Sequence, residues 1–98
     1  MIDLVPYWVT VCRLLGVDPT TVPMPQVVMT PHEGPVYLDV INSIYLPQDK
    51  PVRVGQLNHE LAHAVMCHEF DMDHDQQESM AQWVDTQTED AQEIIIET

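Results

Sequence analysis

His59-Glu60-Leu61-Ala62-His63 is the stretch of this sequence that decides its fold. It has the form H-E-x-x-H, in which two histidines lie one turn apart on the same face of a helix. Both imidazoles can then reach a single ion, and the glutamate between them can take a proton from water that the ion activates. The pattern therefore predicts a metal site with His59 and His63 as ligands and Glu60 as general base.

The residues around the motif are typical of a helix. Neither glycine nor proline interrupts the segment between Gln56 and His68, and apolar residues recur through it. The alternative interpretation is a polar helix face that carries two histidines by coincidence. The helical context and an acidic residue further along the chain both favour the metal site.

Length and charge limit the classes of function. The 98 residues, of which 45% are hydrophobic, predict one globular domain over residues 1–98 with a single core. Three Lys and Arg against sixteen Asp and Glu give a net charge of -13. This charge repels phosphate backbones and anionic membranes, so we expect neither nucleic acid nor a membrane as partner. A peptide or protein substrate, basic for preference, is electrostatically easier to bind; alternatively, the acidity serves only solubility.

The cysteines and the N-terminal residues bear on the compartment. Cys12 and Cys67 lack C-x-x-C spacing, which predicts buried free thiols in a reducing cytoplasm, with one long-range disulfide as the alternative. Residues 2–17 are apolar, but they contain Asp3 and Arg13 and lack a basic leading segment. They therefore predict a first helix rather than a signal peptide or a membrane span. We expect a cytoplasmic protein.

The pattern along the chain predicts an α+β fold. We expect an N-terminal helix from Asp3 to about Leu15, then a small sheet of about three strands that includes one hairpin. The motif helix begins near Val52, after a loop, and a C-terminal helix begins near Asp75. The expected strands are Gln26–Thr30, Val36–Val40 and Ile44–Leu46.

Both outer helices contain recurring apolar positions. In the C-terminal helix these positions are Met80, Trp83, Val84, Ala91, Ile94 and Ile95. Trp8 in the first helix and Trp83 in the last both lie on apolar faces, so we expect both to be largely buried.

A catalytic zinc ion needs three protein ligands and one open position, so a third ligand is required. We predict Glu78, which lies fifteen residues after His63. That distance lets the motif helix end and a second helix fold back beside it. Asp75 is a close competitor, and Cys67 could also approach the ion. Weaker candidates are Asp71, Asp73, His68, His74 and Glu89.

Three segments together resemble a known family. They are the strand Asn42–Leu46, the run His59–Ala64 with the form H-E-L-x-H-A, and Glu78–Ala81 with the form E-x-x-A. The chain resembles a minimal gluzincin of the ImmA/IrrE-like kind. The resemblance implies zinc-dependent peptide hydrolysis with Glu78 as the third ligand. The short loop before Glu78 and the tail from Glu93, which ends where larger relatives continue, depart from that family.

The predicted function is therefore a zinc-dependent peptidase, and three features remain open. The strand Val36–Val40, if it is an edge, could hold an extended peptide by main-chain pairing. Tyr37, Tyr45 and His74 are candidates for a second group that stabilises the oxyanion. One alternative is a catalytically silent interaction protein whose structural zinc takes a fourth ligand from Cys67, Asp75 or His74. Another is a latent protease whose tail or acidic loop fills the cleft.

Overall fold

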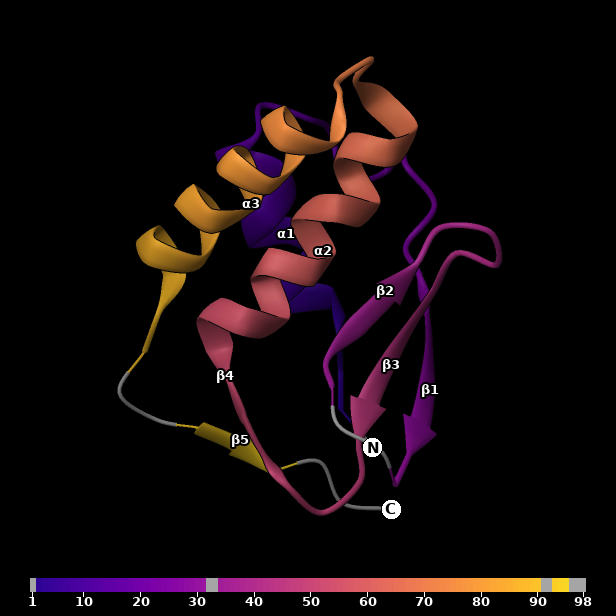
Figure 1. Cartoon of the computed structure of the whole chain (residues 1–98), viewed down its shortest axis with the longest axis vertical. Helices are drawn as coiled ribbons and strands as arrows, with labels where there is room; N and C mark the ends of the chain where they lie inside the picture. Colours follow the sequence, from indigo (N-terminus) through magenta and orange to yellow (C-terminus); the bar gives the residue numbers. More distant parts are fainter. Residues whose placement is uncertain (1, 32–33, 91–92, 96–98) are drawn as a thin grey trace.

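The helix α2 (Val54–Glu69), which carries the motif, lies at the centre of the molecule (Figure 1). The computed structural model describes residues 2–31, 34–90 and 93–95. Nine of the sixteen residues of α2 are buried, because other elements cover it on several sides. The elements packed against it are α1 (Val5–Leu14), α3 (His74–Thr88), β2 (Val36–Leu38) and β4 (Pro51–Arg53).

The N-terminal helix is confirmed. The carboxylate of Asp3 accepts the N–H of Val5 at 3.1 Å, and Pro6 falls in the first turn, where its missing N–H costs nothing. Trp8, Val11 and Cys12 are buried on the face that meets α2, as the apolar stripe predicts. Among the described residues, no helix is long and apolar enough to cross a membrane.

The predicted small sheet and its hairpin are also confirmed. The strands lie in the order β1-β3-β2, where β3 runs parallel to β1 and antiparallel to β2. Ile44 and Leu46 on the central strand are fully buried, whereas Val36 and Leu38 on the edge strand β2 are exposed. The bounds of the strands not yet given are Gln26–Thr30 for β1 and Ser43–Pro47 for β3.

One asparagine fixes the turn between β2 and β3. Asn42 has a positive φ of 44°, a conformation that asparagine tolerates better than most residues. Its side-chain oxygen accepts the hydroxyl of Tyr37 at 2.8 Å, and its side-chain nitrogen donates to the carbonyl of Pro23 at 3.3 Å. The turn thereby holds β2 in place beside α2.

Helix α3 folds back antiparallel to α2 (Figure 1). Asp73 and Gln76 form a reciprocal capping box that starts α3 immediately after the connecting loop. Ala62 and Ala81 are fully buried, and small side chains of this kind let two helices pack closely. The two helices also approach closely at Gly55, where an added Cβ would lie 2.2 Å from Oδ1 and 2.7 Å from the carbonyl oxygen of Asp85.

Two predicted boundaries were wrong because a second, two-stranded sheet was missed. Strand β4 occupies the predicted start of the motif helix, which begins at Val54, and it pairs with β5 (Glu93–Ile95). The C-terminal helix ends at Thr88, so Ile94 and Ile95 are not among its positions. Consecutive β-branched isoleucines favour a strand, and buried Val52 is the partner of Ile94. The remaining predicted helix position, Ala91, lies outside the described residues.

Two predictions of burial were also wrong. Trp8 is buried as expected, but Trp83 is 43% exposed. The inner face of α3 is occupied by Ala81 and Val84, which leaves Trp83 on the outer side. Cys67 is an exposed free thiol near the end of α2, whereas Cys12 is free and buried. Burial raises the pKa of Cys12 to about 11, and the charge of Asp18 adds to the shift.

The contact at Gly55 gives a prediction of stability. Gly to Ala in a helix interior ordinarily stabilises by about 0.5–1 kcal/mol. We expect Gly55→Ala to destabilise by about 1–3 kcal/mol instead, because the methyl group overlaps Asp85. Urea unfolding followed by circular dichroism measures the difference. The control Gln82→Ala, at an exposed position of α3, should stay within about 0.5 kcal/mol of the unchanged protein. Stabilisation by Gly55→Ala would contradict the close packing.

Candidate metal centre

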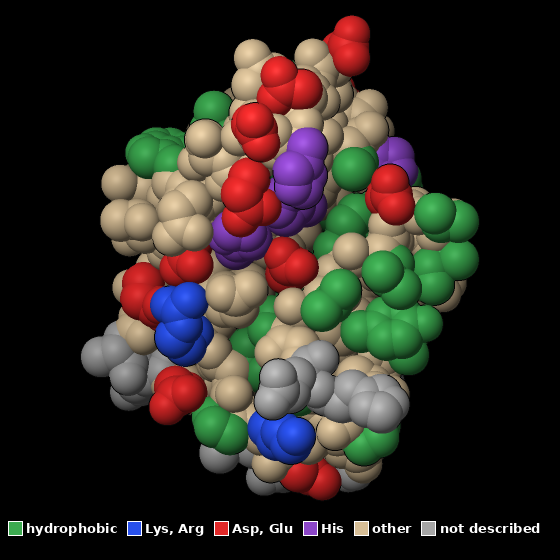
Figure 2. Space-filling view, in the orientation of Figure 1, with side chains coloured by type: hydrophobic (Ala, Val, Ile, Leu, Met, Phe, Trp, Pro, Cys, Tyr) green, Lys and Arg blue, Asp and Glu red, His purple; other side chains and the backbone are tan. Residues whose placement is uncertain are grey.

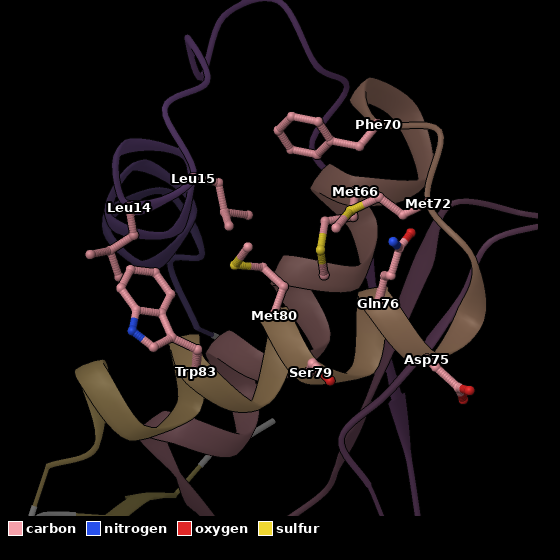
Figure 3. Close-up of a pocket in the computed structure, with 10 residues that line it drawn as sticks. All are labelled: Leu14, Leu15, Met66, Phe70, Met72, Asp75, Gln76, Ser79, Met80 and Trp83. Atoms are coloured by element: carbon pink, nitrogen blue, oxygen red, sulfur yellow. The ribbon is translucent and has the colours of Figure 1, made fainter.

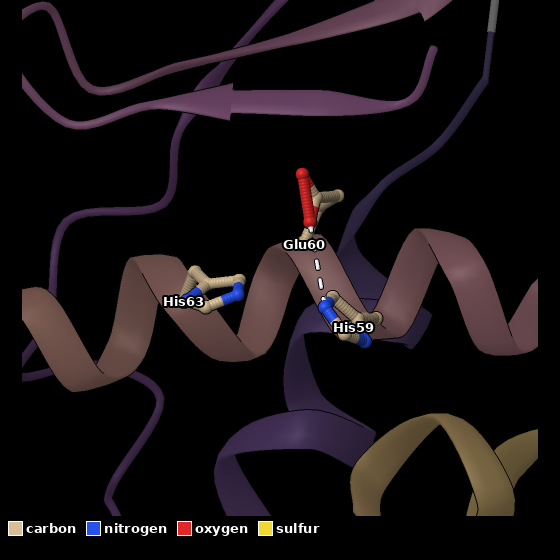
Figure 4. A group of neighbouring side chains, drawn as sticks. All are labelled: His59, Glu60 and His63. Atoms are coloured by element: carbon tan, nitrogen blue, oxygen red, sulfur yellow. Dashed lines mark ion pairs between the residues drawn. The ribbon is translucent and has the colours of Figure 1, made fainter. Parts of the chain in front are cut away.

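Helix α2 presents His59, Glu60 and His63 on the side that lies between α3 and β2 (Figure 4). One ligand atom from each of these residues lies within 4.8 Å of those from the other two. His59 is buried and the other two are half-buried. The one-turn spacing of the histidines thus produces the cluster that the sequence predicted. This group can hold a metal ion.

Glu78 reaches both histidines from α3. Its Oε1 lies 3.0 Å from Nε2 of His59, and its Oε2 lies 3.1 Å from Nε2 of His63. Ligands about 2.1 Å from a tetrahedral ion stand ~3.4 Å apart. The observed separations are only slightly shorter, so a small outward movement of the carboxylate would admit an ion. Glu78 is therefore close enough to both histidines to serve as the predicted third ligand.

Helix α3 also supplies oxygen atoms behind the histidines. A metal on Nε2 requires the proton on Nδ1, and metal-binding histidines nearly always donate that proton to an acceptor. Nδ1 of His63 lies 3.5 Å from Oε1 of Gln77, and Nδ1 of His59 lies 4.0 Å from Oδ2 of Asp85. Nδ1 of His59 is buried without a hydrogen-bond partner among the described residues, and Asp85 is the acceptor it faces.

Asp85 was missed by the sequence reasoning, although its position carried a signal. It lies seven residues after Glu78, which places both residues on one face of α3. Only 6% of Asp85 is exposed, so its charge requires a partner. Nη2 of Arg53 lies 3.4 Å from Oδ2 of Asp85 and supplies it.

Arg53 forms a second ion pair, with Glu89. Oε1 of Glu89 also accepts the N–H of Gly55 at 3.2 Å, and so occupies one of the free amides at the start of α2. Glu89, a weaker ligand candidate in the sequence, therefore joins the end of α3 to the start of α2.

Glu60 lies apart from the Glu78 side of the cluster. Its Oε1 accepts the main-chain N–H of Tyr37 on β2 at 3.2 Å, and its Oε2 lies 4.0 Å from Nε2 of His59. Burial raises the pKa of Glu60, while the Tyr37 N–H and the two histidines act in the opposite direction. A carboxylate with a raised pKa next to a metal site is suited to accept a proton near neutral pH.

The other ligand candidates from the sequence lie outside the group of His59, His63 and Glu78. Asp75 lines an apolar groove between α1 and α3, Asp73 caps α3, and Nδ1 of His68 donates to the carbonyl of Ala64 at 2.9 Å. The remaining ligand candidates, Asp71, His74 and Cys67, are exposed.

Tyr37, a candidate oxyanion stabiliser, uses its hydroxyl at the Asn42 turn. Burial raises the pKa of this hydroxyl to about 12, and the neighbouring Cys67 and Asp39 add to the shift. The contribution of Tyr37 to the site is its main-chain N–H.

No family model, curated protein or solved structure matches this chain significantly. The kind of site is therefore defined by its own residues: two imidazoles and one carboxylate that meet between two antiparallel helices. The side chain of Glu78 is 50% exposed. Figure 2 shows histidine and acidic side chains next to one another on this face. The centre is open to solvent on this side.

The geometry predicts which carboxylate binds the ion. We expect Glu78→Gln to weaken zinc binding by more than the ~10–100-fold that loss of an outer partner costs, because the oxygen facing each histidine changes its charge. Asp75→Asn, in the same helix, should stay within about twofold. Competition with a chromophoric zinc chelator measures both affinities. A larger loss in Asp75→Asn would move the third ligand to Asp75.

Proposed function

We propose that this chain is a zinc-dependent peptidase that hydrolyses peptide bonds, with His59, His63 and Glu78 as zinc ligands and Glu60 as general base. The observation that carries the proposal is the different placement of the two carboxylates. Glu78 contacts both Nε2 atoms, whereas Glu60 contacts β2 and stands beside the cluster. This division corresponds to one ligand and one base.

The donor set fits zinc. Two imidazole nitrogens and one carboxylate, with a further position open, are the ligands of a catalytic zinc ion. Magnesium and calcium prefer oxygen donors alone, so the paired histidines favour a transition metal. Within the described residues, Nδ1 of His59 is buried without a hydrogen bond, and Oδ2 of Asp85 at 4.0 Å is the nearby acceptor that could take its proton and fix the tautomer of a ligating imidazole.

The chain's own residues supply the proton transfer. When bound, zinc polarises the scissile carbonyl and makes water a stronger nucleophile. Glu60 accepts the proton of the attacking water on its carboxylate and then delivers that proton to the leaving amine nitrogen. Glu60 and His59 are successive residues of α2, and Glu78 of α3 contacts His59. The position of the base is therefore coupled to the positions of the ligands.

Strand β2 is suited to hold the substrate. It is an edge strand, and its outward N–H at Tyr37 points at Glu60. An extended peptide that pairs with β2 would take this N–H and free one oxygen of Glu60. Val36 and Leu38, 42% and 40% exposed, lie on one face of β2 and offer apolar contact to the peptide. No lysine or arginine occurs in residues 54–98, which favours basic substrates.

A non-catalytic role is the second candidate, favoured by the position of the ligands. An ion between the histidines of α2 and Glu78 of α3 would join the two helices, and small domains gain stability from such an ion. An interaction protein of this kind needs His59, His63 and Glu78 but has no use for Glu60. In a latent protease the cleft would be filled by the chain itself. The end of the tail proposed for that role, beyond Ile95, lies outside the described residues.

Glu60→Gln separates the enzyme from the structural zinc protein. The variant keeps the shape of the side chain and removes its proton acceptor. We expect hydrolysis of peptides to fall by about 10²–10⁴-fold while zinc content and thermal stability change little. Cleavage of a peptide library, followed by mass spectrometry, measures the loss.

The control for this experiment is Gln82→Glu, which adds a carboxylate at an exposed position of α3 and should keep full activity. An active protein whose Glu60→Gln variant retains full activity would remove Glu60 as the base. Zinc binding without hydrolysis in either form would favour the non-catalytic role.

A further inference from the structure

A second concave surface lies between the end of α1, the C-terminal half of α2 and the outer face of α3 (Figure 3). We call it the α1–α3 groove. Its volume is about 1000 Å³. The large apolar side chains that line it include Leu14, Met66, Phe70, Met72, Met80 and Trp83.

The apolar side chains of the groove are exposed together. Leu14 is 36% exposed, Phe70 39%, Met80 36% and Trp83 43%. Single exposed apolar residues are normal, but a contiguous group in a concave surface is typical of an interaction site. The three methionines add flexible, polarisable side chains that adapt to the shape of a bound partner.

The groove and the metal centre use different faces of α3. Gln76, Met80 and Trp83 follow the spacing of one helix face and line the groove. Glu78 and Asp85 lie on the roughly opposite face and point to the histidines. The exposure of Trp83 is therefore not a consequence of the metal site, and the proposed peptidase function does not explain it.

The charges around the groove are mostly acidic, with one basic residue, the exposed Arg13, beside Leu14 at the end of α1. Eleven of the sixteen acidic residues, and none of the three basic ones, lie in residues 54–98. Glu69, Asp71 and Asp73 are exposed around the connection between α2 and α3, and Asp75 lines the groove itself. We call these four residues the acidic rim. Figure 2 shows acidic side chains gathered at this end of the molecule, far from the blue lysine and arginine side chains.

We propose that the α1–α3 groove binds an amphipathic helix of a partner protein, with large apolar side chains on one face and lysine or arginine at its flanks. The apolar floor takes anchors spaced one turn apart, as in other complexes of a helix in a groove. The acidic rim selects positive flanking charge and speeds association. A second copy of this chain, with a net charge of -13, would bring two acidic rims together. An anionic lipid would be repelled in the same way.

The test uses a designed helical peptide as the probe. It is a fluorescein-labelled, 16-residue peptide of leucine, alanine and lysine, with leucines at helix positions i, i+3, i+4 and i+7 and lysines elsewhere on the surface. We expect saturable binding to the full chain by fluorescence anisotropy. Replacing the lysines with glutamates should weaken binding at least tenfold, and binding to the lysine form should weaken as salt is raised.

Variants of the chain test whether the peptide binds in the groove. Met80→Glu adds a charge to the apolar floor and should weaken binding at least tenfold. Val40→Glu is the matched control, because Val40 is 92% exposed in the turn after β2, away from the groove; it should bind normally. Leu14→Glu, at an exposed position of α1 that lines the groove, adds a charge to the opposite wall and serves as a second test if Met80→Glu is poorly folded by circular dichroism. Zinc binding should be unchanged in all three variants, which separates failure of this proposal from failure of the metal site.

Several outcomes would overturn the proposal. If the peptide binds Met80→Glu or Leu14→Glu as tightly as it binds the unchanged chain, its binding site lies outside the groove. Equal binding of the glutamate peptide would remove the role of the acidic rim. If sedimentation detects dimers of the chain and Met80→Glu abolishes them, the groove binds a second copy of the chain instead. Binding of phosphatidylglycerol vesicles, abolished by the same substitution, would make the groove a lipid site.

Discussion

The close antiparallel packing of α3 on α2 is the constraint on which the rest of the structure depends. At Gly55 the two helices approach so closely that an added Cβ would overlap Asp85. This contact fixes the rotation of α3, and two turns earlier in α3 Glu78 then falls between the Nε2 atoms of His59 and His63. The candidate metal centre is thus a property of a helix pair. The motif supplies two of the proposed ligands, but the packing determines which third group lies beside them.

A chain of charges strengthens this packing from the metal centre to the start of α2. Asp85 faces Nδ1 of His59 and pairs with Arg53, and Arg53 also pairs with Glu89, which in turn accepts an amide of α2. Removing one member of such a partly buried network leaves another charge unpaired, which is more costly than losing an exposed ion pair. Arg53 is one of only three basic residues in the chain, and its use here supports the importance of the network.

The sequence predicted the features that depend on local pattern. The zincin spacing placed His59 and His63 on one helix face, and apolar periodicity predicted α1, the three-stranded sheet and the burial of Trp8. What it missed depends on contacts between distant segments. Strand β5 pairs with β4, where Ile94 lies opposite the buried Val52. Trp83 is exposed because smaller residues of α3 fill the helix interface. Periodicity identifies an apolar position but not whether a neighbour covers it. Asp85 was missed because its seven-residue spacing from Glu78 indicates a shared face of α3 but not its position beside His59.

X-ray absorption at the zinc edge of the zinc-loaded protein in solution tests the central claim most directly, because it reports the ligands themselves. The account predicts only nitrogen and oxygen neighbours at about 2.0–2.1 Å, with outer-sphere scattering from two imidazoles. In the Glu78→Gln variant this first shell should change while the two imidazoles remain. A sulfur neighbour at about 2.3 Å would assign Cys67 to the ion. That result, or scattering from three imidazoles, would contradict a centre built from His59, His63 and Glu78.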